Sequence, residues 1–382
     1  MRVKYSYLEE QFKDYQNIFK KIAGVVKTGD FTLGKAVQEF EKKFATLLGA
    51  RYGVGVNSGT DALFLSLKVI GVGPGDEVIT APNTFIATVG AIVASGARPV
   101  FVDVTDEYVI NPDLIGKAIT SRTKAIMPVH YAGVPADMDE IMAIVDRHGV
   151  PVIEDACQAI SASLNGKCAG TFGTTGGFSL HPLKNLNVWG DSGIIITNSE
   201  EIRDRLVLLR NHGMRNRDEV DFFGYNSRLD SVQAVVGNHL IKDINWITET
   251  RIKWAQELDS ALEELSEWIT VPKRRPNKRY VHHLYMIKAK DRDKLLSFLN
   301  QNGIEAKIHY PIPLHLQRCS SHLGYQEGDF PVTEAQVKSI ITLPVHQHLK
   351  EEQVHYMIGK IKEFYKKYGR SESKISGSSK AV

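Results

Sequence analysis

One lysine occupies a context in which its amine would act as a nucleophile rather than as a solvated charge. Lys184 lies in HPLKNLNVW (181–189), directly after the apolar run GGFSL (176–180) and without another Lys, Arg, Asp or Glu in its segment. A lysine amine forms a Schiff base with a carbonyl group when burial or a nearby positive charge lowers its pKa. Taken alone, an exposed loop lysine is the ordinary expectation, because lysine is seldom fully buried.

Two adjacent acids end another apolar run, in VIEDACQA (152–159). Glu154 and Asp155 stand where a carboxylate is costly to bury unless it has a partner. The protonated ring nitrogen of an aromatic cofactor is one such partner, and Gln158 could then reach an oxygen on the same ring. A helix N-cap or a structural ion pair explains the two acids equally well.

A third segment, NSGTDALFLSL (57–67), is a small-residue turn that runs into a helical pattern. Free backbone N–H groups at a helix N-terminus, together with the hydroxyls of Ser58 and Thr60, would bind a phosphate group. Ser179, shortly before Lys184, could add another phosphate contact. By itself the segment is more typical of a plain Ser/Thr N-cap, because that capping signal is common.

Taken in this order, the three segments fit the parts of one anionic aromatic cofactor, pyridoxal 5′-phosphate (PLP). PLP enzymes hold the cofactor as a Schiff base on a lysine and keep its ring cationic with an acidic residue. Open α/β sheets bind ligands at the carboxyl ends of their strands, which is where all three segments are expected to lie.

The surrounding pattern predicts an α/β domain that would position these residues. Val37, Phe40, Phe44 and Leu47 keep helical spacing, and short runs that are apolar on both faces alternate with such helices. Runs of that kind suit a mostly parallel central sheet flanked by helices. The predicted strands are EVIT (77–80), PVFVDV (99–104), KAIMPV (124–129), PVIEDA (151–156), GGFSL (176–180) and GIIIT (193–197).

The pattern changes after Leu229. A helical stripe without proline extends from Asp230 to Trp268, which predicts a helix about 50 Å long that bridges two domains. Beyond it, the strand-like VHHLYMIK (281–288) and IEAKIHY (304–310) flank the helical DRDKLLSFLNQNG (291–303), which predicts a smaller α+β domain. We therefore expect a large PLP-binding domain with an N-terminal helix (1–245), a small C-terminal domain (246–368) and a disordered polar tail (369–382).

The bulk properties exclude several classes of protein. The 382 residues are 43% hydrophobic and 24% charged, and 47 Lys and Arg against 44 Asp and Glu leave a net charge of +3, so neither a nucleic-acid nor a membrane partner is expected. Three cysteines without a CxxC pair predict neither a disulfide framework nor a metal site. The charged start MRVKYSYLEE is unlike a signal peptide, and nowhere do 18 apolar residues run together, so we expect a cytoplasmic protein.

With these features together, the chain resembles the DegT/StrS-type sugar aminotransferases, a family of fold-type I PLP enzymes. The resemblance extends from GDFTLG (29–34) to LPVHQHL (343–349), and the joint order of its motifs is specific. These motifs are SGTDAL, APNTF (81–85), PVHYAG (128–133), EDACQA, FSLHPLKNL, GDSG, RNHGMRN (210–216), GYNSRLD (224–230) and HYPIPLHLQ (309–317). One departure is Ser192 in GDSG, where many members have GDGG.

The resemblance implies a role for each matching position. Lys184 would be the Schiff-base lysine and the acid/base that moves the proton, Asp155 would hold the pyridinium and Gln158 the phenolic oxygen. Phe85 would stack on the ring, although an ordinary core aromatic explains it too. The implied phosphate ligands are Ser58, Gly59, Thr60, Ser179 and, from the neighbouring subunit of a homodimer, Asn226, which could otherwise simply cap the long helix.

The resemblance also implies a ping-pong transamination. An amino acid, with L-glutamate as the expected donor, would leave its amino group on the cofactor as pyridoxamine 5′-phosphate, and a nucleotide-linked 3-keto sugar would then take it up. A 4-keto sugar, a PLP-dependent sugar dehydratase and a non-catalytic regulator remain open, although the dehydratase branch has histidine in place of the lysine. The implied substrate contacts are Arg215, Lys307, His309, Tyr310 and His315, and packing or helix capping is the alternative for the two histidines.

Overall fold

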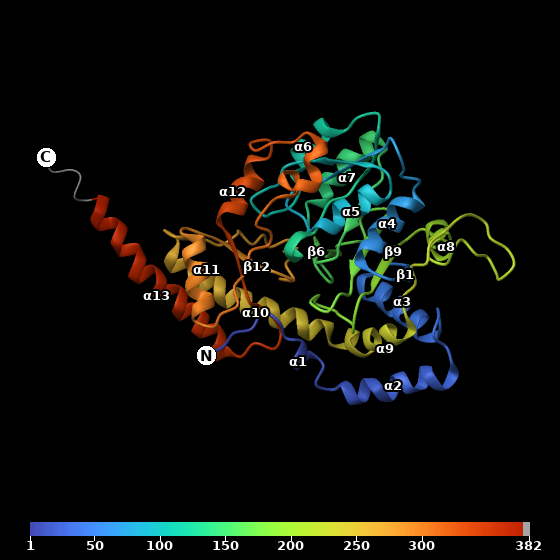
Figure 1. The fold of residues 1–382 in the computed structure, drawn as a ribbon, viewed down its shortest axis with the longest axis horizontal. Helices are drawn as coiled ribbons and strands as arrows, with labels where there is room; N and C mark the ends of the chain where they lie inside the picture. The colour runs from blue at the N-terminus through green and yellow to red at the C-terminus, as the bar shows by residue number, and fades with distance from the viewer. Residues whose placement is uncertain (377–382) are drawn as a thin grey trace.

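The chain forms two packed regions that are joined by helix α10 (Ile244–Leu262), as a computed structural model of the protein shows (Figure 1). The structure describes residues 1–376, with side chains up to residue 367. Helices α1 (Leu8–Gln11) and α2 (Tyr15–Thr28) lead into the larger region. Within the described residues, no helix is both long enough and apolar enough to cross a membrane.

A mostly parallel sheet forms the centre of the larger region. One part has the strand order β1-β9-β8-β5 and the other β3-β2-β4, and parallel bridges Ile126↔Val152 and Val129↔Asp155 connect the two parts between β4 and β5. The strands are β1 (Tyr52–Val56), β2 (Glu77–Thr80), β3 (Arg98–Phe101), β4 (Thr123–Ile126), β5 (Ile153–Asp155), β8 (Thr175–Ser179) and β9 (Gly193–Thr197). The predicted α/β class with a mostly parallel sheet is confirmed.

Strand β9 is the one reversed strand among these seven. It pairs antiparallel with both β1 and β8, and its first residue, Gly193, lies opposite Ser179, the last residue of β8. The connection 180–192 therefore leaves and re-enters the sheet at the same edge. Because it starts at the carboxyl end of β8, this connection holds Lys184 at the edge where the parallel strands end.

Helices cover both faces of the sheet because the strands are apolar on both faces. Along β9, Ile194 and Ile196 pack with Phe40 and Phe44 on one face, whereas Ile195 packs with helices on the other. This alternation follows the two-residue period of a strand. The covering helices are α3 (Lys35–Leu48), α4 (Gly59–Val69), α5 (Ile86–Ala94), α6 (Pro112–Ala118), α7 (Met138–His148), α8 (Glu200–Leu209) and α9 (Ser231–Leu240).

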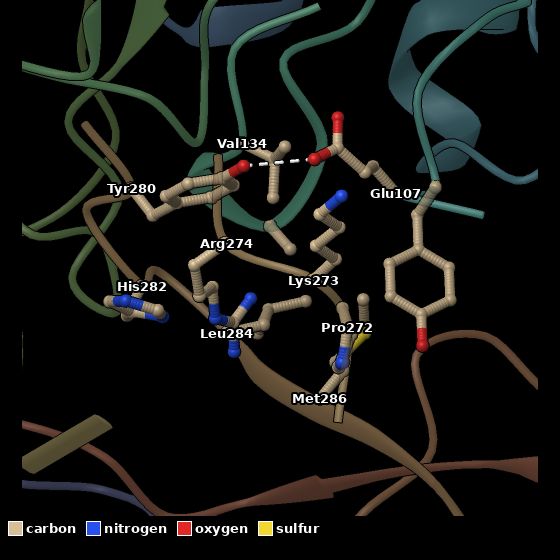
Figure 2. A pocket seen from close by; sticks show the side chains of 11 residues that line it. Glu107, Val134, Pro272, Lys273, Arg274, Tyr280, His282, Leu284 and Met286 are labelled. Atoms are coloured by element: carbon tan, nitrogen blue, oxygen red, sulfur yellow. Dashed lines mark hydrogen bonds between the residues drawn. The ribbon is translucent and has the colours of Figure 1, made fainter. Parts of the chain in front are cut away.

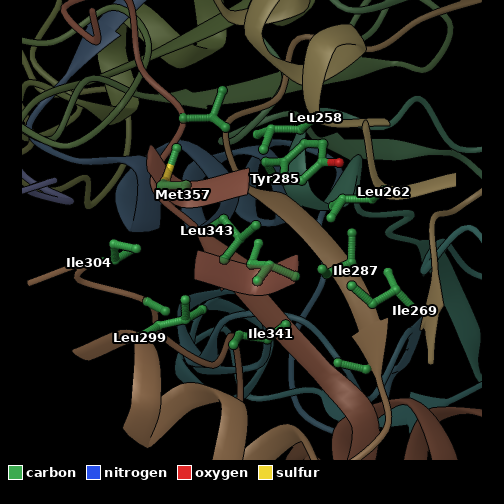
Figure 3. Packing of buried hydrophobic residues seen from close by; sticks show 14 of the residues in the cluster. Leu258, Leu262, Ile269, Tyr285, Ile287, Leu299, Ile304, Ile341, Leu343 and Met357 are labelled. Atoms are coloured by element: carbon green, nitrogen blue, oxygen red, sulfur yellow. The ribbon is translucent and has the colours of Figure 1, made fainter. Parts of the chain in front are cut away.

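The second region has its own hydrophobic core (Figure 3). An antiparallel sheet with the order β10-β12-β13 packs against α10 and two further helices, and Val3 from the start of the chain is buried among them. The elements are β10 (Ile269–Thr270), α11 (Arg292–Gln301), β12 (Tyr285–Ala289), α12 (Pro331–Ser339), β13 (Ile340–Leu343) and α13 (Glu351–Ser376).

Short elements complete the fold. A small sheet of β6 (Ser163–Leu164), β7 (Lys167–Cys168) and β11 (Lys278–Arg279) connects the segment after α10 to the larger region. The 3-10 turns are η1 (Tyr131–Gly133), η2 (Ile241–Asp243), η3 (Glu263–Leu265), η4 (Leu314–Leu316) and η5 (Arg318–Leu323).

Two predicted elements differ from the structure. The long bridging helix is divided at η2 into α9 and α10, because the apolar spacing alone does not distinguish a 3-10 turn from an α-helical one. The run 304–310 is not a strand: it makes only isolated bridges, Val3↔Ile304 and Lys307↔Thr342. This segment lies over a cavity that is described below, and its polar side chains line that cavity. Its backbone does not form the continuous hydrogen-bond ladder of a strand.

The predicted division at residue 245 falls inside α10 and remains a proposal, with the two hydrophobic cores as its support. Of the predicted tail, residues 369–376 continue α13, and residues 377–382 lie outside the described residues.

Candidate active site

A cavity of about 330 Å³ lies at the carboxyl edge of the sheet, between the two regions. The larger region contributes the start of α4, the start of α5, the end of β5 and the connection after β8. The second region contributes His283, Leu284, Lys307, His309 and Tyr310, and Tyr5 comes from the N-terminal segment. The lining from the larger region includes Ser58, Gly59, Thr60, Phe85, Thr88, Asp155, Gln158, Ser179 and Lys184.

Lys184 presents a free amine to this cavity. Its backbone is fixed, since its N–H donates to His181 O at 2.8 Å and its carbonyl accepts from the Tyr7 hydroxyl at 2.9 Å. The side chain is half-buried, and in the described part of the chain its Nζ makes no hydrogen bond or ion pair. Burial lowers the pKa of the amine, while the nearby Cys157 and Asp155 partly oppose that shift. The lowered pKa favours the neutral, nucleophilic form of the amine.

Asp155 turns its buried carboxylate to the same cavity. Its Oδ2 accepts the Thr88 hydroxyl at 2.6 Å, and its Oδ1 accepts the backbone N–H of Cys157 at 3.1 Å. Thr88 has one hydroxyl hydrogen and donates it to Asp155. In the 2.7 Å contact between the two threonine hydroxyls, Thr84 is therefore the donor. In the part of the chain that the structure describes, the hydrogen-bond donors to this carboxylate are neutral, and it can still pair with a cationic ligand.

The neighbouring acid, Glu154, points away from the cavity. Its carboxylate accepts the backbone N–H groups of Gly170, Phe172 and Gly173 at 2.6–2.7 Å and pairs with His130 Nε2 at 2.9 Å. His130 Nδ1 accepts the N–H of Ala136, so the ring donates to Glu154 through Nε2–H. Of the two acids in the predicted motif, one is therefore structural and one faces the cavity.

The first turn of α4 forms the predicted anion cradle. Ser58 is the N-cap, with its Oγ accepting the N–H of Asp61 at 3.0 Å, so the plain capping alternative is also correct. The next N–H groups, of Gly59 and Thr60, precede any intrahelical partner and are available to an anion. Gly59 is required here, because a Cβ at this position would lie 2.6 Å from Ser179 Cβ.

Phe85, Gln158 and Tyr310 complete the walls. The Phe85 ring, 47% exposed, lies 5.6 Å from the Tyr310 ring between centroids, so it is not an ordinary core aromatic. Gln158 is buried, and its Oε1 accepts the N–H of Ala132 at 2.7 Å. A nucleophilic amine, an unneutralised carboxylate, a phosphate cradle and an aromatic face thus surround one space, and together they fit PLP.

The predicted substrate residues divide into two groups. Lys307, His309 and Tyr310 line the cavity, and Lys307 Nζ lies 4.6 Å from the centre of the Tyr5 ring. His309 Nδ1 is 3.0 Å from Thr342 Oγ1, and burial lowers the pKa of His309 to about 4. Arg215 is exposed on a loop and paired with Asp221 at 2.9 Å, outside the cavity.

His315 and Asn226 also lie outside the cavity of their own chain. His315 is buried, with its Nε2 3.0 Å from Glu334 Oε1 and its ring against Phe330, which corresponds to the packing alternative and corrects its expected place at the substrate. Asn226 is exposed beside Asn57 and Arg228 at a separate polar pocket of about 260 Å³.

Several lining residues were not predicted, including Tyr5, Thr84, Thr88 and His283. Thr84 lies within the APNTF motif and Thr88 one helical turn after it, so the spacing of their hydroxyls was the available signal. No signal in the sequence identified Tyr5 or His283, because only the tertiary packing brings the start of the chain and the segment before β12 to this site.

A second pocket, lined by residues of both regions, is too small to hold a ligand such as PLP (Figure 2). It has about 10 Å³ of space, and the Tyr280 hydroxyl donates to Glu107 Oε1 at 2.9 Å at its rim. That volume accommodates about one water molecule. Among the described residues, no group of three or more His, Cys, Asp or Glu side chains is arranged to hold a metal ion.

Comparison with known proteins places this geometry in a family. The model of the DegT/DnrJ/EryC1/StrS aminotransferase family matches residues 13–362. A pleiotropic regulatory protein of Geobacillus stearothermophilus is 42% identical, with 94% of this chain and 98% of that protein aligned. A UDP-N-acetyl-3-dehydro-alpha-D-glucosamine 3-aminotransferase of Acidithiobacillus ferrooxidans is 40% identical over 88% of this chain and 90% of its own.

Solved structures agree with this relationship. DesV of S. venezuelae, in complex with a ketimine intermediate, has a TM-score of 0.92 and 37% identity, covering 95% of this chain and 98% of its own. NtdA of Bacillus subtilis, with bound cofactor PMP, has a TM-score of 0.86 and 32% identity, covering 94% of this chain and 85% of its own.

Proposed function

The chain belongs to the DegT/DnrJ/EryC1/StrS aminotransferase family, and from this premise we propose that it transfers an amino group from L-glutamate to a nucleotide-linked 3-keto sugar, with PLP as its cofactor. One observation carries the proposal: the Lys184 amine, which has no hydrogen-bond partner among the described residues, and the buried Asp155 carboxylate line the same cavity. That pair matches the two ends of the PLP ring system that every transaminating site must hold.

The cofactor would be held by residues from three elements. The first turn of α4 and Ser179 would bind the phosphate, Asp155 the ring nitrogen, Gln158 the phenolic oxygen, and Phe85 would cover one ring face. Bound PLP supplies an electrophilic carbonyl and a cationic ring that withdraws electrons from the reacting carbon. The protein's contribution is then to orient these groups and to keep the ring cationic through Asp155.

Lys184 would move the proton during the reaction. Burial lowers the pKa of its amine, which favours the unprotonated form that would accept a proton from the α-carbon of the amino donor and return it at the carbon on the other side of the transferred nitrogen. One cavity serves both substrates, which favours a ping-pong order in which the 2-oxo acid leaves before the keto sugar enters. Lys307 and His309 lie at the end contributed by the second region, where a cation and a neutral imidazole suit a diphosphate and sugar hydroxyls.

Amination at C3 is supported by the relative from Acidithiobacillus ferrooxidans, whose name specifies a 3-dehydro sugar and a 3-aminotransferase. The segment HPLKNLNVWGDSG around Lys184 points the same way, since it resembles members that aminate C3. The name of the Geobacillus relative, a regulatory protein, describes that protein. For this chain, a lysine amine and a buried carboxylate that line one cavity support transamination instead.

We further propose a homodimer with shared active sites. Asn226 is exposed and outside its own cavity, and Phe223, three residues earlier, is fully exposed. Val220 and Tyr225 in the same loop are exposed as well, and a group of exposed apolar side chains is typical of a surface that a partner covers. In this arrangement Asn226 would complete the phosphate site of the neighbouring subunit.

A substrate screen tests the proposed function. Purified protein loaded with PLP is incubated with L-glutamate and nucleotide-linked 3-keto or 4-keto sugars, and the products are identified by mass spectrometry. We expect an amino sugar from the 3-keto substrate together with 2-oxoglutarate, and neither product from Lys184→Ala. Amination of only the 4-keto sugar would overturn the C3 assignment, and loss of a sugar hydroxyl without amination would favour a dehydratase.

A further inference from the structure

We infer that Tyr7 is a positioning residue for Lys184, and that it acts from an N-terminal strap, residues 3–7, anchored in the second region. The inference rests on the proposed function, because it assigns Lys184 the reacting amine. It adds a residue that touches neither the cofactor nor the substrate, and that lies far from Lys184 in the sequence.

The strap is fixed at its first residues by the second region. Val3 is fully buried in that region's core, its N–H donates to Gly303 O at 2.8 Å, and its carbonyl accepts the N–H of Glu305 at 3.0 Å. The N–H of Tyr5 then donates to Glu305 Oε2 at 2.9 Å. The strap therefore runs beside 303–305 and cannot move independently of the segment that carries Lys307 and His309.

Tyr7 joins this strap to the backbone that carries the reacting amine. Its hydroxyl donates to Lys184 O at 2.9 Å and approaches Leu183 O at 3.4 Å. In the described part of the chain, no other group donates to the Lys184 carbonyl. Burial raises the pKa of the Tyr7 hydroxyl, so it keeps its proton and remains a donor throughout the ordinary pH range.

The Tyr7 ring is held by residues of the second region. It stacks on His346 with 5.0 Å between ring centroids, and the Arg251 guanidinium lies 5.2 Å from its centre. Arg251 is fully buried and donates to the carbonyls of His282 at 3.1 Å and Val345 at 3.0 Å. His282 directly precedes His283 on the cavity wall, so one chain of contacts links the second region's wall to the Lys184 backbone.

This link matters because the amine must meet its target within a fraction of an ångström. A displacement of about 1 Å at a reacting group can lower a rate roughly 100-fold. Deleting the Tyr7 hydroxyl leaves a carbonyl of the Lys184 connection without a donor, and that connection must shift to find another. A purely structural tyrosine would change stability alone.

Tyr7→Phe tests the inference, with Tyr365→Phe as the matched control. Tyr365 is also buried, and its hydroxyl also donates to a backbone carbonyl, Lys290 O at 2.8 Å, but it lies in the second core away from the cavity. Each variant is measured for the rate of PLP attachment to Lys184 across pH, read by borohydride reduction and peptide mass spectrometry. The pH midpoint of bound-cofactor absorbance, kcat, KM and Tm are measured in parallel.

We expect Tyr7→Phe and Tyr365→Phe to lose similar amounts of Tm. Only Tyr7→Phe should attach PLP more slowly and shift the pH midpoint of the absorbance. Its kcat should fall by about 10- to 100-fold, with a smaller change in KM. Tyr7→4-aminophenylalanine, which restores a donor and also provides a folded comparison, should recover much of the loss. Equal attachment and absorbance in wild type and Tyr7→Phe, or an equal effect of Tyr365→Phe, would overturn the inference. If wild-type protein itself attaches no PLP at Lys184, the proposed function fails instead, and the inference fails with it.

Discussion

Thr88 donates its hydroxyl hydrogen to Asp155 Oδ2 across 2.6 Å, and Thr84 donates in turn to Thr88. This relay holds the acid that we propose for the ring nitrogen in one orientation without neutralising it. Thr88→Val keeps the side-chain shape and removes the donor. A hydrogen bond to a charged group contributes about 1.5–3 kcal/mol, so we expect PLP affinity and kcat to fall by roughly 10- to 100-fold.

Thr88→Ser, which keeps the hydroxyl, is the control and should retain most of the affinity. The measurement is the PLP dissociation constant of the apoprotein together with kcat. If the valine and serine variants bind and turn over alike, the relay does not support Asp155.

Glu154 should behave as a structural acid despite its position next to Asp155. Glu154→Gln removes the charge that three backbone N–H groups and His130 share. A hydrogen bond to a charged group contributes about 1.5–3 kcal/mol and this carboxylate accepts four, so we expect a large fall in the denaturant midpoint. PLP absorbance and kcat of the folded fraction should stay near wild type, and a selective loss of activity at unchanged stability would contradict this division of roles.

Mixed dimers can test whether Asn226 acts in the neighbouring subunit. Lys184→Ala and Asn226→Ala are each expected to be weak or inactive as pure proteins. In a mixed dimer, the Lys184 of one chain faces the intact Asn226 of the other, so one of the two sites is wild type. We expect activity to reappear when the two variants are unfolded together and refolded, and no recovery would mean that Asn226 acts within its own chain.

His309 should make the protein less stable in acid. Its pKa is about 4 in the folded chain, because it is buried, against an ordinary value of 6.5. Between these two values the unfolded chain binds more protons, so stability falls as the pH decreases from 6.5 to 4. We expect His309→Gln to show a smaller fall in Tm over this range than wild type, measured in the apoprotein, with equal slopes contradicting the assignment.

Much of the architecture could be predicted because apolar runs and breakers report local structure directly. EVIT and GIIIT coincide with β2 and β9, residue for residue. The reversal of β9 could not be predicted, since a strand buried on both faces has the same apolar pattern in either direction. Likewise, 304–310 has strand-like residues but is used to line a cavity.

In the candidate site, too, residues at strand ends could be predicted, whereas residues that depend on contacts between distant parts of the chain could not. Lys184, Asp155 and the turn at Ser58 share one cavity, as expected from their places at strand ends. His315 was misjudged because its buried partner, Glu334, lies on a helix that the motif does not include. Tyr5 and Tyr7 could not be identified at all, because their contacts with 303–309 and with Lys184 join distant parts of the chain.

The cavity walls come from separate stretches of chain, and in our proposal the sheet edge builds the cofactor end, whereas 304–310 and its surroundings build the sugar end. Under the proposed function, sugar selectivity and amino transfer are therefore coupled through this stretch. A chimera that exchanges 306–310 with a relative would change the sugar end alone, whereas one that also exchanges Glu305 would loosen the strap that carries Tyr7.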